Sequence, residues 1–257
     1  MEGTVFATLS WVEMTIIVFG AFITSYIHGA TGLAGGILLA AILAPIIGVT
    51  PLVPVMSVTL LISHLSRAWF NKGDFHRGIY FLIVLPAIPA LIITTHLYAS
   101  LNAAWISGIL GTVVLISIPY RHWAAHKKIK TRKSALVAAG AMHGSLTGVS
   151  IGPGMLLVPL MFGYGLTKEA FVATFAAIAL TVNSVRVVSF GAIGLLPLDY
   201  LALGFLTGLL SIPGNYVGRM SLRRMNIARH SLWVDLLTCL AGGNFIWIML
   251  REMMARG

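Results

Sequence analysis

The chain has 257 residues, of which 58% are hydrophobic and only 9% are charged, and its mean hydropathy is +0.94. Soluble domains carry about 25% charged residues, so a chain this apolar has too little polar surface to fold in water. Composition therefore excludes a water-soluble enzyme or binding module and indicates an integral membrane protein.

The formal net charge of +10 does not point to a nucleic-acid binder, because the charges are spread over separate loops. Most of the 17 Lys and Arg residues fall in three short polar gaps between apolar runs, at 71–78, 121–133 and 219–230. Basic loops of this kind are typical of the cytoplasmic side of a membrane protein. We therefore expect a lipid bilayer around the chain and no nucleic acid as a partner. The single cysteine, Cys239, excludes an internal disulfide.

A membrane-spanning helix needs roughly 20 apolar residues, with a range of about 17–25. The first run carries no Lys or Arg before it, so we expect it to be a retained helix and not a cleaved signal. Two shorter apolar runs, Gly36–Val49 and Gly154–Leu166, each follow a glycine-rich stretch and are predicted to be half-length or re-entrant helices. The predicted long helices are Trp11–Tyr26, Leu52–Phe70, Ile79–His96, Trp105–Pro119, Ser134–Val149, Ala170–Phe190, Tyr200–Val217 and Leu232–Leu250.

The second half of the chain repeats the first. His28-Gly29 matches His143-Gly144, a Gly-x-Leu-Leu sequence comes after each pair, and Arg67 matches Arg186. The spacing between matching positions stays between 115 residues at the histidines and 119 at the arginines. We therefore predict an N-terminal repeat over residues 1–120, a basic cytoplasmic linker at 121–133, and a C-terminal repeat over residues 134–257.

Charge predicts how the repeats are oriented. With five segments in each half, all three basic loops lie in the cytoplasm, and the N-terminus and the nearly uncharged loops 97–103 and 191–199 lie outside. The matching loops 71–78 and 191–199 then fall on opposite sides, which is the signature of an inverted-topology repeat. Arg251 and Arg256 at an external C-terminus fit this arrangement less well. The predicted fold is an all-α, polytopic transmembrane helical bundle of two inverted-topology repeats, each of about five segments with a discontinuous helix at its glycine-rich break.

The two glycine-rich breaks, Gly29–Gly36 and Gly144–Gly154, are the first candidates for a binding site. Glycine in a membrane helix can serve close helix packing, and that use stays open here. Pro153, however, has no backbone N–H and predicts a real interruption. A half-helix that starts inside the membrane leaves N–H groups that need an acceptor, and a bound anion supplies one at the positive end of the helix dipole.

Two arginines and three histidines are the second group of candidates. Arg67 and Arg186 lie in apolar runs, where a charged residue indicates function, although Arg67 is near enough to a segment end to reach the interface. His28 and His143 lie beside the breaks and could donate to an anion or shuttle a proton, whereas His64 has packing as its simplest use. No metal-ligand spacing is present, so we expect neither a metal nor another cofactor.

The scarcity of acidic residues predicts the charge of the substrate. Only seven carboxylates occur in the chain, and most lie near segment ends, whereas cation pathways usually need an intramembrane Asp or Glu. We therefore expect an anionic substrate, with Ser57, Ser66 and Ser184 as weaker candidates for the same cavity. The predicted substrate-binding residues are His28, Thr31, Gly35, Gly36, Ile37, Arg67, His143, Thr147, Ser150, Gly152, Gly154, Met155, Asn183 and Arg186.

At these breaks the sequence resembles the sulfite exporter TauE/SafE family. The stretch Gly144–Pro159 (GSLTGVSIGPGMLLVP) carries the resemblance most closely, and Gly29–Pro51 is a looser copy in which Ala34 and Ala41 stand for the expected glycine and proline. The resemblance implies a permease of the bacterial inner membrane, and substrates that are sulfur-containing anions such as sulfite, sulfoacetate or other sulfonates.

The sequence as a whole predicts a secondary transporter of such an anion that works by alternating access. No Gly-x-x-x-x-Gly-Lys-Ser/Thr loop is present, so ATP does not drive it on this chain. An anion channel and a transporter of a non-sulfur anion such as a carboxylate stay open, as does a homodimer. We expect no enzymatic activity, because Ser145 and His143 would diverge on a helix end and no Gly-x-Ser-x-Gly elbow occurs.

Overall fold

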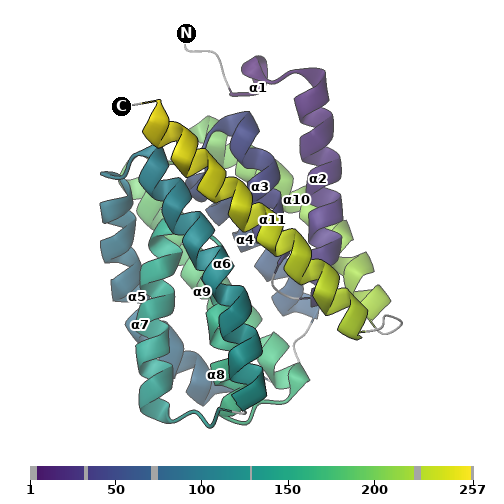
Figure 1. Ribbon diagram of the computed structural model, residues 1–257, viewed down its shortest axis with the longest axis vertical. Helices are drawn as coiled ribbons and strands as arrows, with labels where there is room; N and C mark the ends of the chain where they lie inside the picture. The colour runs from purple at the N-terminus through teal and green to yellow at the C-terminus, as the bar shows by residue number, and fades with distance from the viewer. Residues whose placement is uncertain (1–4, 32–33, 71–74, 128, 223–226, 256–257) are drawn as a thin grey trace.

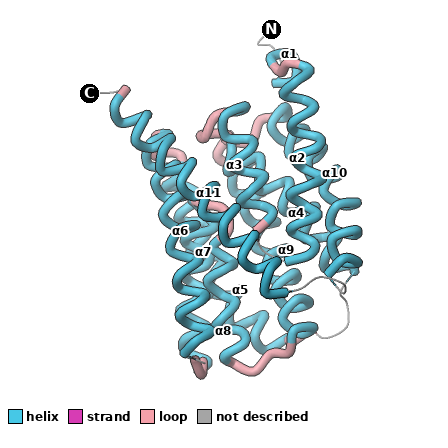
Figure 2. The backbone as a smooth tube through the Cα atoms, turned by 45° about the vertical axis from the view of Figure 1, so that its right-hand side comes forward, coloured by secondary structure: helices cyan, strands magenta, loops and turns pink. Residues whose placement is uncertain are grey.

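The computed structural model describes residues 5–31, 34–70, 75–127, 129–222 and 227–255, and this part of the chain is helical with no strand (Figures 1 and 2). The all-helical prediction is therefore confirmed. Every predicted long run and both short runs form helices. The elements are α1 (Val5–Thr8), α2 (Trp11–Thr31), α3 (Gly35–Ile47), α4 (Leu52–Phe70), α5 (Arg77–Tyr98), α6 (Ala103–Lys127), α7 (Lys133–Val149), the 3-10 helix η1 (Pro153–Leu156), α8 (Leu157–Gly163), α9 (Lys168–Ala192), α10 (Leu198–Leu222) and α11 (Ile227–Met254).

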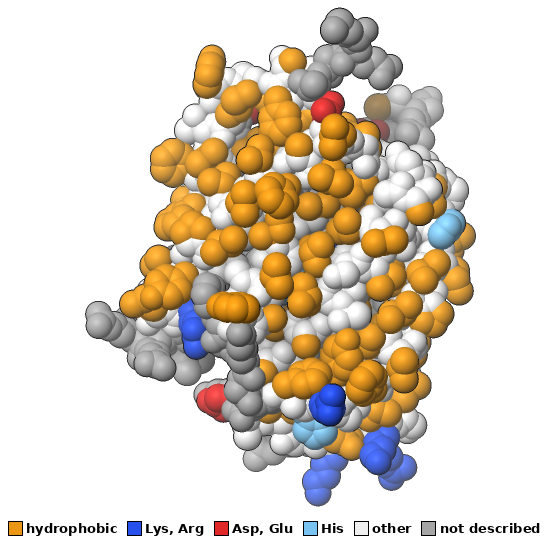
Figure 3. All heavy atoms as spheres, turned by 180° about the vertical axis from the view of Figure 1, so that it is seen from behind, with side chains coloured by type: hydrophobic (Ala, Val, Ile, Leu, Met, Phe, Trp, Pro, Cys, Tyr) orange, Lys and Arg blue, Asp and Glu red, His pale blue; other side chains and the backbone are white. Residues whose placement is uncertain are grey.

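Six of the described helices, α2, α4, α5, α6, α9 and α10, are long and apolar enough to cross a membrane. Large apolar side chains such as Trp11, Ile93 and Val188 are exposed on their outer faces, which suits a hydrocarbon solvent. On the face seen in Figure 3, hydrophobic side chains cover the upper and middle parts, and Lys and Arg gather in the lower half. The chain is a multi-pass membrane protein.

Two of the predicted loops are shorter than expected. α6 continues to Lys127, so more than half of the basic segment 121–133 is helical, and α10 continues to Leu222 through Arg219. Helix continues there because backbone N–H and C=O groups near the membrane need partners that a helix supplies by itself. Residues 71–74 and 223–226, which belong to the other predicted basic loops, lie outside the described part.

The helices pack by one scheme that occurs twice. α5 packs along α7 as α10 packs along α2, and α5 packs on α9 as α10 packs on α4 (Figures 1 and 2). Each of these four pairs, like α4–α9 and α6–α11, combines one helix from each half of the chain. α4 and α9 are the most enclosed of the long helices, so residues on their facing sides lie at the centre of the bundle.

Small residues make the closest of these contacts. Gly140, Gly144 and Gly148 recur every fourth residue on α7, and a Cβ added at any of them would overlap α5. Gly214 and Gly218 on α10 meet α2 in the same way. Glycines at this spacing let two membrane helices approach until their backbones touch.

Candidate functional site

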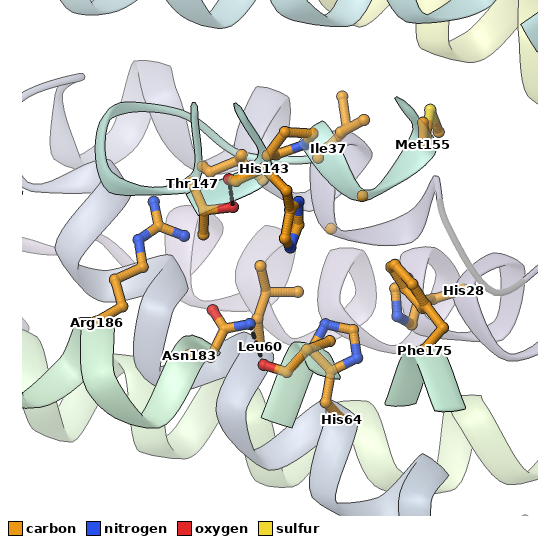
Figure 4. Close-up of a pocket in the computed structure, with 16 residues that line it drawn as sticks. His28, Ile37, Leu60, His64, His143, Thr147, Met155, Phe175, Asn183 and Arg186 are labelled. Atoms are coloured by element: carbon orange, nitrogen blue, oxygen red, sulfur yellow. Dashed lines mark hydrogen bonds between the residues drawn. The ribbon is translucent and has the colours of Figure 1, made fainter. Parts of the chain in front are cut away.

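A cavity of about 50 Å³ lies at the centre of the bundle, where the two chain breaks meet α4 and α9 (Figure 4). A single buried water needs about 10–15 Å³ measured in this way, so the cavity has room for a small ion. Its lining comes from both halves of the chain and consists of His28, Gly36, Ile37, Leu60, His64, His143, Thr147, Ile151, Gly152, Pro153, Gly154, Met155, Phe175, Ala179, Asn183 and Arg186.

Both predicted breaks interrupt the helix. In the first half α2 ends at Thr31 and α3 begins at Gly35, and in the second half α7 ends at Val149 and η1 begins at Pro153. Gly152, the residue before Pro153, has a φ of 89°, a left-handed conformation that favours glycine. Proline suits the first position of a helix because its missing N–H would have no helical partner there. The interruption predicted at Pro153 is therefore present.

The two breaks touch each other. A Cβ added at Gly152 would overlap the side chain of Ile37, which stands in the first turn of α3. Gly36 and Ile37 from the first break, and Gly154 and Met155 from the second, line the cavity together. The start of α3 and the start of η1 thus lie at one place, although they are more than 110 residues apart in the chain.

Fewer backbone N–H groups at the starts of α3 and η1 lack an acceptor than the sequence predicts. The Ile37 N–H donates to the Ala34 carbonyl at 3.1 Å, and the Met155 N–H donates to the Gly152 carbonyl at 3.1 Å. Both helices begin with a tight turn, which uses these amides internally. The Gly154 N–H, in contrast, finds no acceptor in the described part of the chain.

The glycines at the start of each predicted break serve packing. A Cβ at Gly29 would overlap the backbone of Asn215 on α10, and one at Gly144 would overlap the backbone of Ala87 on α5. Both residues lie inside helices, at matching contacts of the two halves. Packing and cavity formation, which the sequence left as alternatives, thus belong to different glycines of the same motif.

Arg186 of α9 is 1% exposed and lines the cavity. One of its terminal nitrogens, Nη2, donates to the Ser150 carbonyl at 2.9 Å, and its guanidinium lies 5.7 Å from the centre of the Phe190 ring. Its Nε has no partner among the described residues. The second break therefore orients the guanidinium, while part of its donor capacity remains unused beside the cavity.

Arg67 of α4 lies behind the cavity and is not part of its lining. Its Nη1 lies 3.0 Å from Nε2 of His28 and 3.5 Å from Nδ1 of His64. The two imidazoles, which meet edge to face with centres 5.4 Å apart, do line the cavity. His143 approaches from the opposite wall and points toward His64 (Figure 4).

Most of the predicted site residues come together. His28, Gly36, Ile37, His143, Thr147, Gly152, Gly154, Met155, Asn183 and Arg186 line the cavity. Arg67 and Ser150 support lining residues, and Gly35 belongs to a smaller neighbouring cavity between α2, α3, α4 and α10. The side chain of Thr31 lies outside the described part. Ser57, Ser66, Ser145 and Ser184 are absent from the described lining.

Sequence reasoning missed several walls of the cavity. His64 is assigned to packing and Pro153 only to the interruption, and the predicted binding residues also leave out Leu60, Ile151, Phe175 and Ala179. The ring of Phe175 occupies the space where a Cβ at Gly154 would lie. For His64, the spacing of three residues to Arg67 on a helix was an available signal, because residues three apart share a face.

The titratable side chains in the described lining of the cavity are all basic. Its described lining contains a guanidinium and three imidazoles but no Asp or Glu. No three His, Cys, Asp or Glu side chains in the described part stand close enough to hold a metal ion. The buried polar side chains include Arg67 and Arg186 and no described carboxylate.

A comparison with protein-family models finds a match to the model described as Sulfite exporter TauE/SafE over residues 17–245. This match covers nearly the whole chain, including both breaks and all residues of the cavity. Neither the search of curated proteins nor the search of solved structures finds a match.

Proposed function

This chain belongs to the sulfite exporter TauE/SafE family, a family of membrane transporters, and we propose that it carries a small sulfur-containing anion through the cavity between its two breaks. The proposed substrate is an organosulfonate such as sulfoacetate, or sulfite. The proposed membrane is the bacterial inner membrane. The sulfur in the substrate rests on the family alone, whereas the negative charge is supported by the cavity itself.

The observation that carries the proposal is a buried guanidinium in a cavity without a carboxylate. Arg186 is 1% exposed, and no described lining residue is an Asp or Glu. A buried cation without a counter-ion is strongly destabilising, and an anion in the cavity relieves that cost. Guanidinium also offers paired donors in a rigid plane, which matches the oxygens of a sulfonate or sulfite.

Backbone geometry favours the same ligand. Gly154 lies in the first turn of η1 and lines the cavity, and its N–H has no backbone acceptor within the described residues. Together with the guanidinium of Arg186, it would contact one anion from two directions.

The mechanism we propose is alternating access by two inverted-topology repeats, 1–120 and 134–257, joined by 121–133. The packing scheme that occurs twice supports this division, because α5–α7 corresponds to α10–α2 if the second half matches the first. The cavity draws its walls from both repeats, so a movement of the helices around it would open it to either side. An anion channel would show the same lining, and only flux measurements separate the two.

The test is uptake of labelled sulfoacetate or sulfite into proteoliposomes that contain the purified chain. We expect saturable uptake and counterflow, which a channel does not show. Arg186→Met should reduce uptake at least tenfold, whereas Arg77→Met, at the exposed start of α5, should leave it unchanged. Competition by acetate as strong as that by sulfite would favour the carboxylate alternative, and full activity of Arg186→Met would refute the site.

A further inference from the structure

Arg67 does not line the cavity, but it contacts two histidines that do. Its Nη1 lies 3.0 Å from His28 Nε2, and all three side chains of the Arg67–His28–His64 group are at most 5% exposed. We propose that Arg67 is a positioning residue that holds His28 in the Nδ1–H tautomer, and thereby makes a neutral imidazole into a hydrogen-bond donor for the anion. This inference rests on the proposed function for the identity of the ligand.

The tautomer follows from donor chemistry. A guanidinium has five N–H donors and no acceptor, so the nitrogen that faces Arg67 must accept. His28 Nε2 therefore carries a lone pair, and the ring proton is on Nδ1. That Nδ1 is buried and has no hydrogen-bond partner among the described residues, while the His28 side chain lines the cavity. A buried N–H donor of this kind is costly unless a ligand accepts from it.

The same nitrogen of Arg67 also faces His64. Nη1 bears two hydrogens, one for His28 and one for His64 Nδ1, at a longer distance of 3.5 Å. Acceptance at Nδ1 places the His64 proton on Nε2. The two histidines then have opposite tautomers, although both present an N–H on the side of the ring away from Arg67.

The charged and titratable groups around His28 favour its neutral form. Arg67 and His64 face it from α4, and the cavity beyond holds His143 from α7 and Arg186 from α9. Protonation of His28 would place a second positive charge 3.0 Å from Arg67 and would remove the lone pair that its hydrogen bond needs. His28 therefore acts as a fixed donor and not as a proton carrier.

The matching arginine of the second half has a different task. Arg186 donates to the Ser150 carbonyl and lines the cavity itself, whereas Arg67 contacts the anion site through histidine. The anion would thus meet a charged donor on one side and neutral donors on the other. Neutral donors limit the total charge of the cavity, which allows the anion to leave it again.

The experiment is ¹⁵N NMR of histidine-labelled protein in lipid nanodiscs, with His28→Asn used to assign the His28 signals. Protonated and unprotonated ring nitrogens have well-separated ¹⁵N shifts, so the tautomer is read directly and without any ligand. We expect a protonated Nδ1 and a bare Nε2 for His28 in the wild type. In Arg67→Met we expect this pattern to be lost, and in Arg67→Lys, which keeps a donor, we expect it to be retained.

Sulfite and sulfoacetate binding is then measured by thermal shift on the same samples. Arg67→Met should bind about tenfold more weakly or worse, Arg67→Lys should recover part of that loss, and Arg77→Met should match the wild type. A bare Nδ1 in the wild type, or an unchanged His28 tautomer in Arg67→Met, would overturn the inference. Unchanged affinity despite a changed tautomer would overturn it as well. A wild type that binds no anion would instead refute the proposed function, while the tautomer is still measured independently.

Discussion

Ile37 of α3 fills the space that a side chain at Gly152 would need, so the two interrupted helices are in direct contact at the cavity. Gly152 also has a φ of 89°. Glycine is therefore needed at position 152 for two reasons: Ile37 approaches it closely, and its backbone is left-handed.

The first prediction concerns this contact. Gly152→Ala should lower the free energy of unfolding by about 1–2 kcal/mol from backbone strain and by about 1–3 kcal/mol from the overlap with Ile37. Gly165→Ala separates these causes, because Gly165 has a φ of 106° but no atom within 4 Å of an added Cβ. Thermal unfolding in detergent should rank wild type above Gly165→Ala, and Gly165→Ala above Gly152→Ala. Equal losses in the two variants would contradict the contact.

The second prediction concerns helix packing. Gly144→Ala should destabilise the protein by about 1–3 kcal/mol, because the new methyl group would overlap the Ala87 carbonyl on α5. Gly191→Ala, near the end of α9, is the control, because nothing lies within 4 Å of its added Cβ. Replacing a helical glycine by alanine there should be neutral or stabilising by up to about 1 kcal/mol. Similar melting temperatures for the two variants would argue against the packing role.

The third prediction introduces a carboxylate into the cavity. Asn183 lies three residues before Arg186 on α9, and both line the cavity. Asn183→Asp keeps the shape of the side chain but places a negative charge beside the guanidinium, where it would compete with the substrate. Anion affinity should fall about 100-fold or more, whereas Asn183→Ala should lose about tenfold or less. Thermal-shift titration with sulfite measures both, and retained affinity in Asn183→Asp would count against an anion site.

The fourth prediction concerns the contact between α6 and α11. Arg121 and Asp235 form a salt bridge, and His122 Nε2 lies 2.7 Å from the second Asp235 oxygen. Because the pair is partly exposed, Asp235→Asn should destabilise the protein by about 1 kcal/mol or less, and the difference should shrink in high salt. Glu252→Gln on α11 is the control, since no ion pair of Glu252 is present in the described chain. A salt-independent difference would show that charge is not the cause.

The apolar runs and the two interruptions could be predicted without a structure because they depend on local chemistry. A run of apolar residues has to be helical in lipid, where only a helix satisfies each backbone group within its own segment. Pro153 has no N–H to donate and stands at the first position of a helix, after a glycine with a left-handed backbone, whereas Pro86, Pro89 and Pro213 lie inside helices. The pairing of His28 with His143 and of Arg67 with Arg186 was also visible, because duplication leaves matching residues at a nearly constant spacing.

The different contacts that these residues make were decided by the packing of segments that are separate in the sequence. Gly29 and Gly144 touch neighbouring helices, Gly152 and Gly154 form the cavity wall, and nothing in the motif itself distinguishes them. Likewise, Arg67 faces two histidines while Arg186 faces a carbonyl of the chain break. The direction of each side chain depends on how its helix crosses helices from other parts of the sequence, and that crossing is set only when the bundle folds.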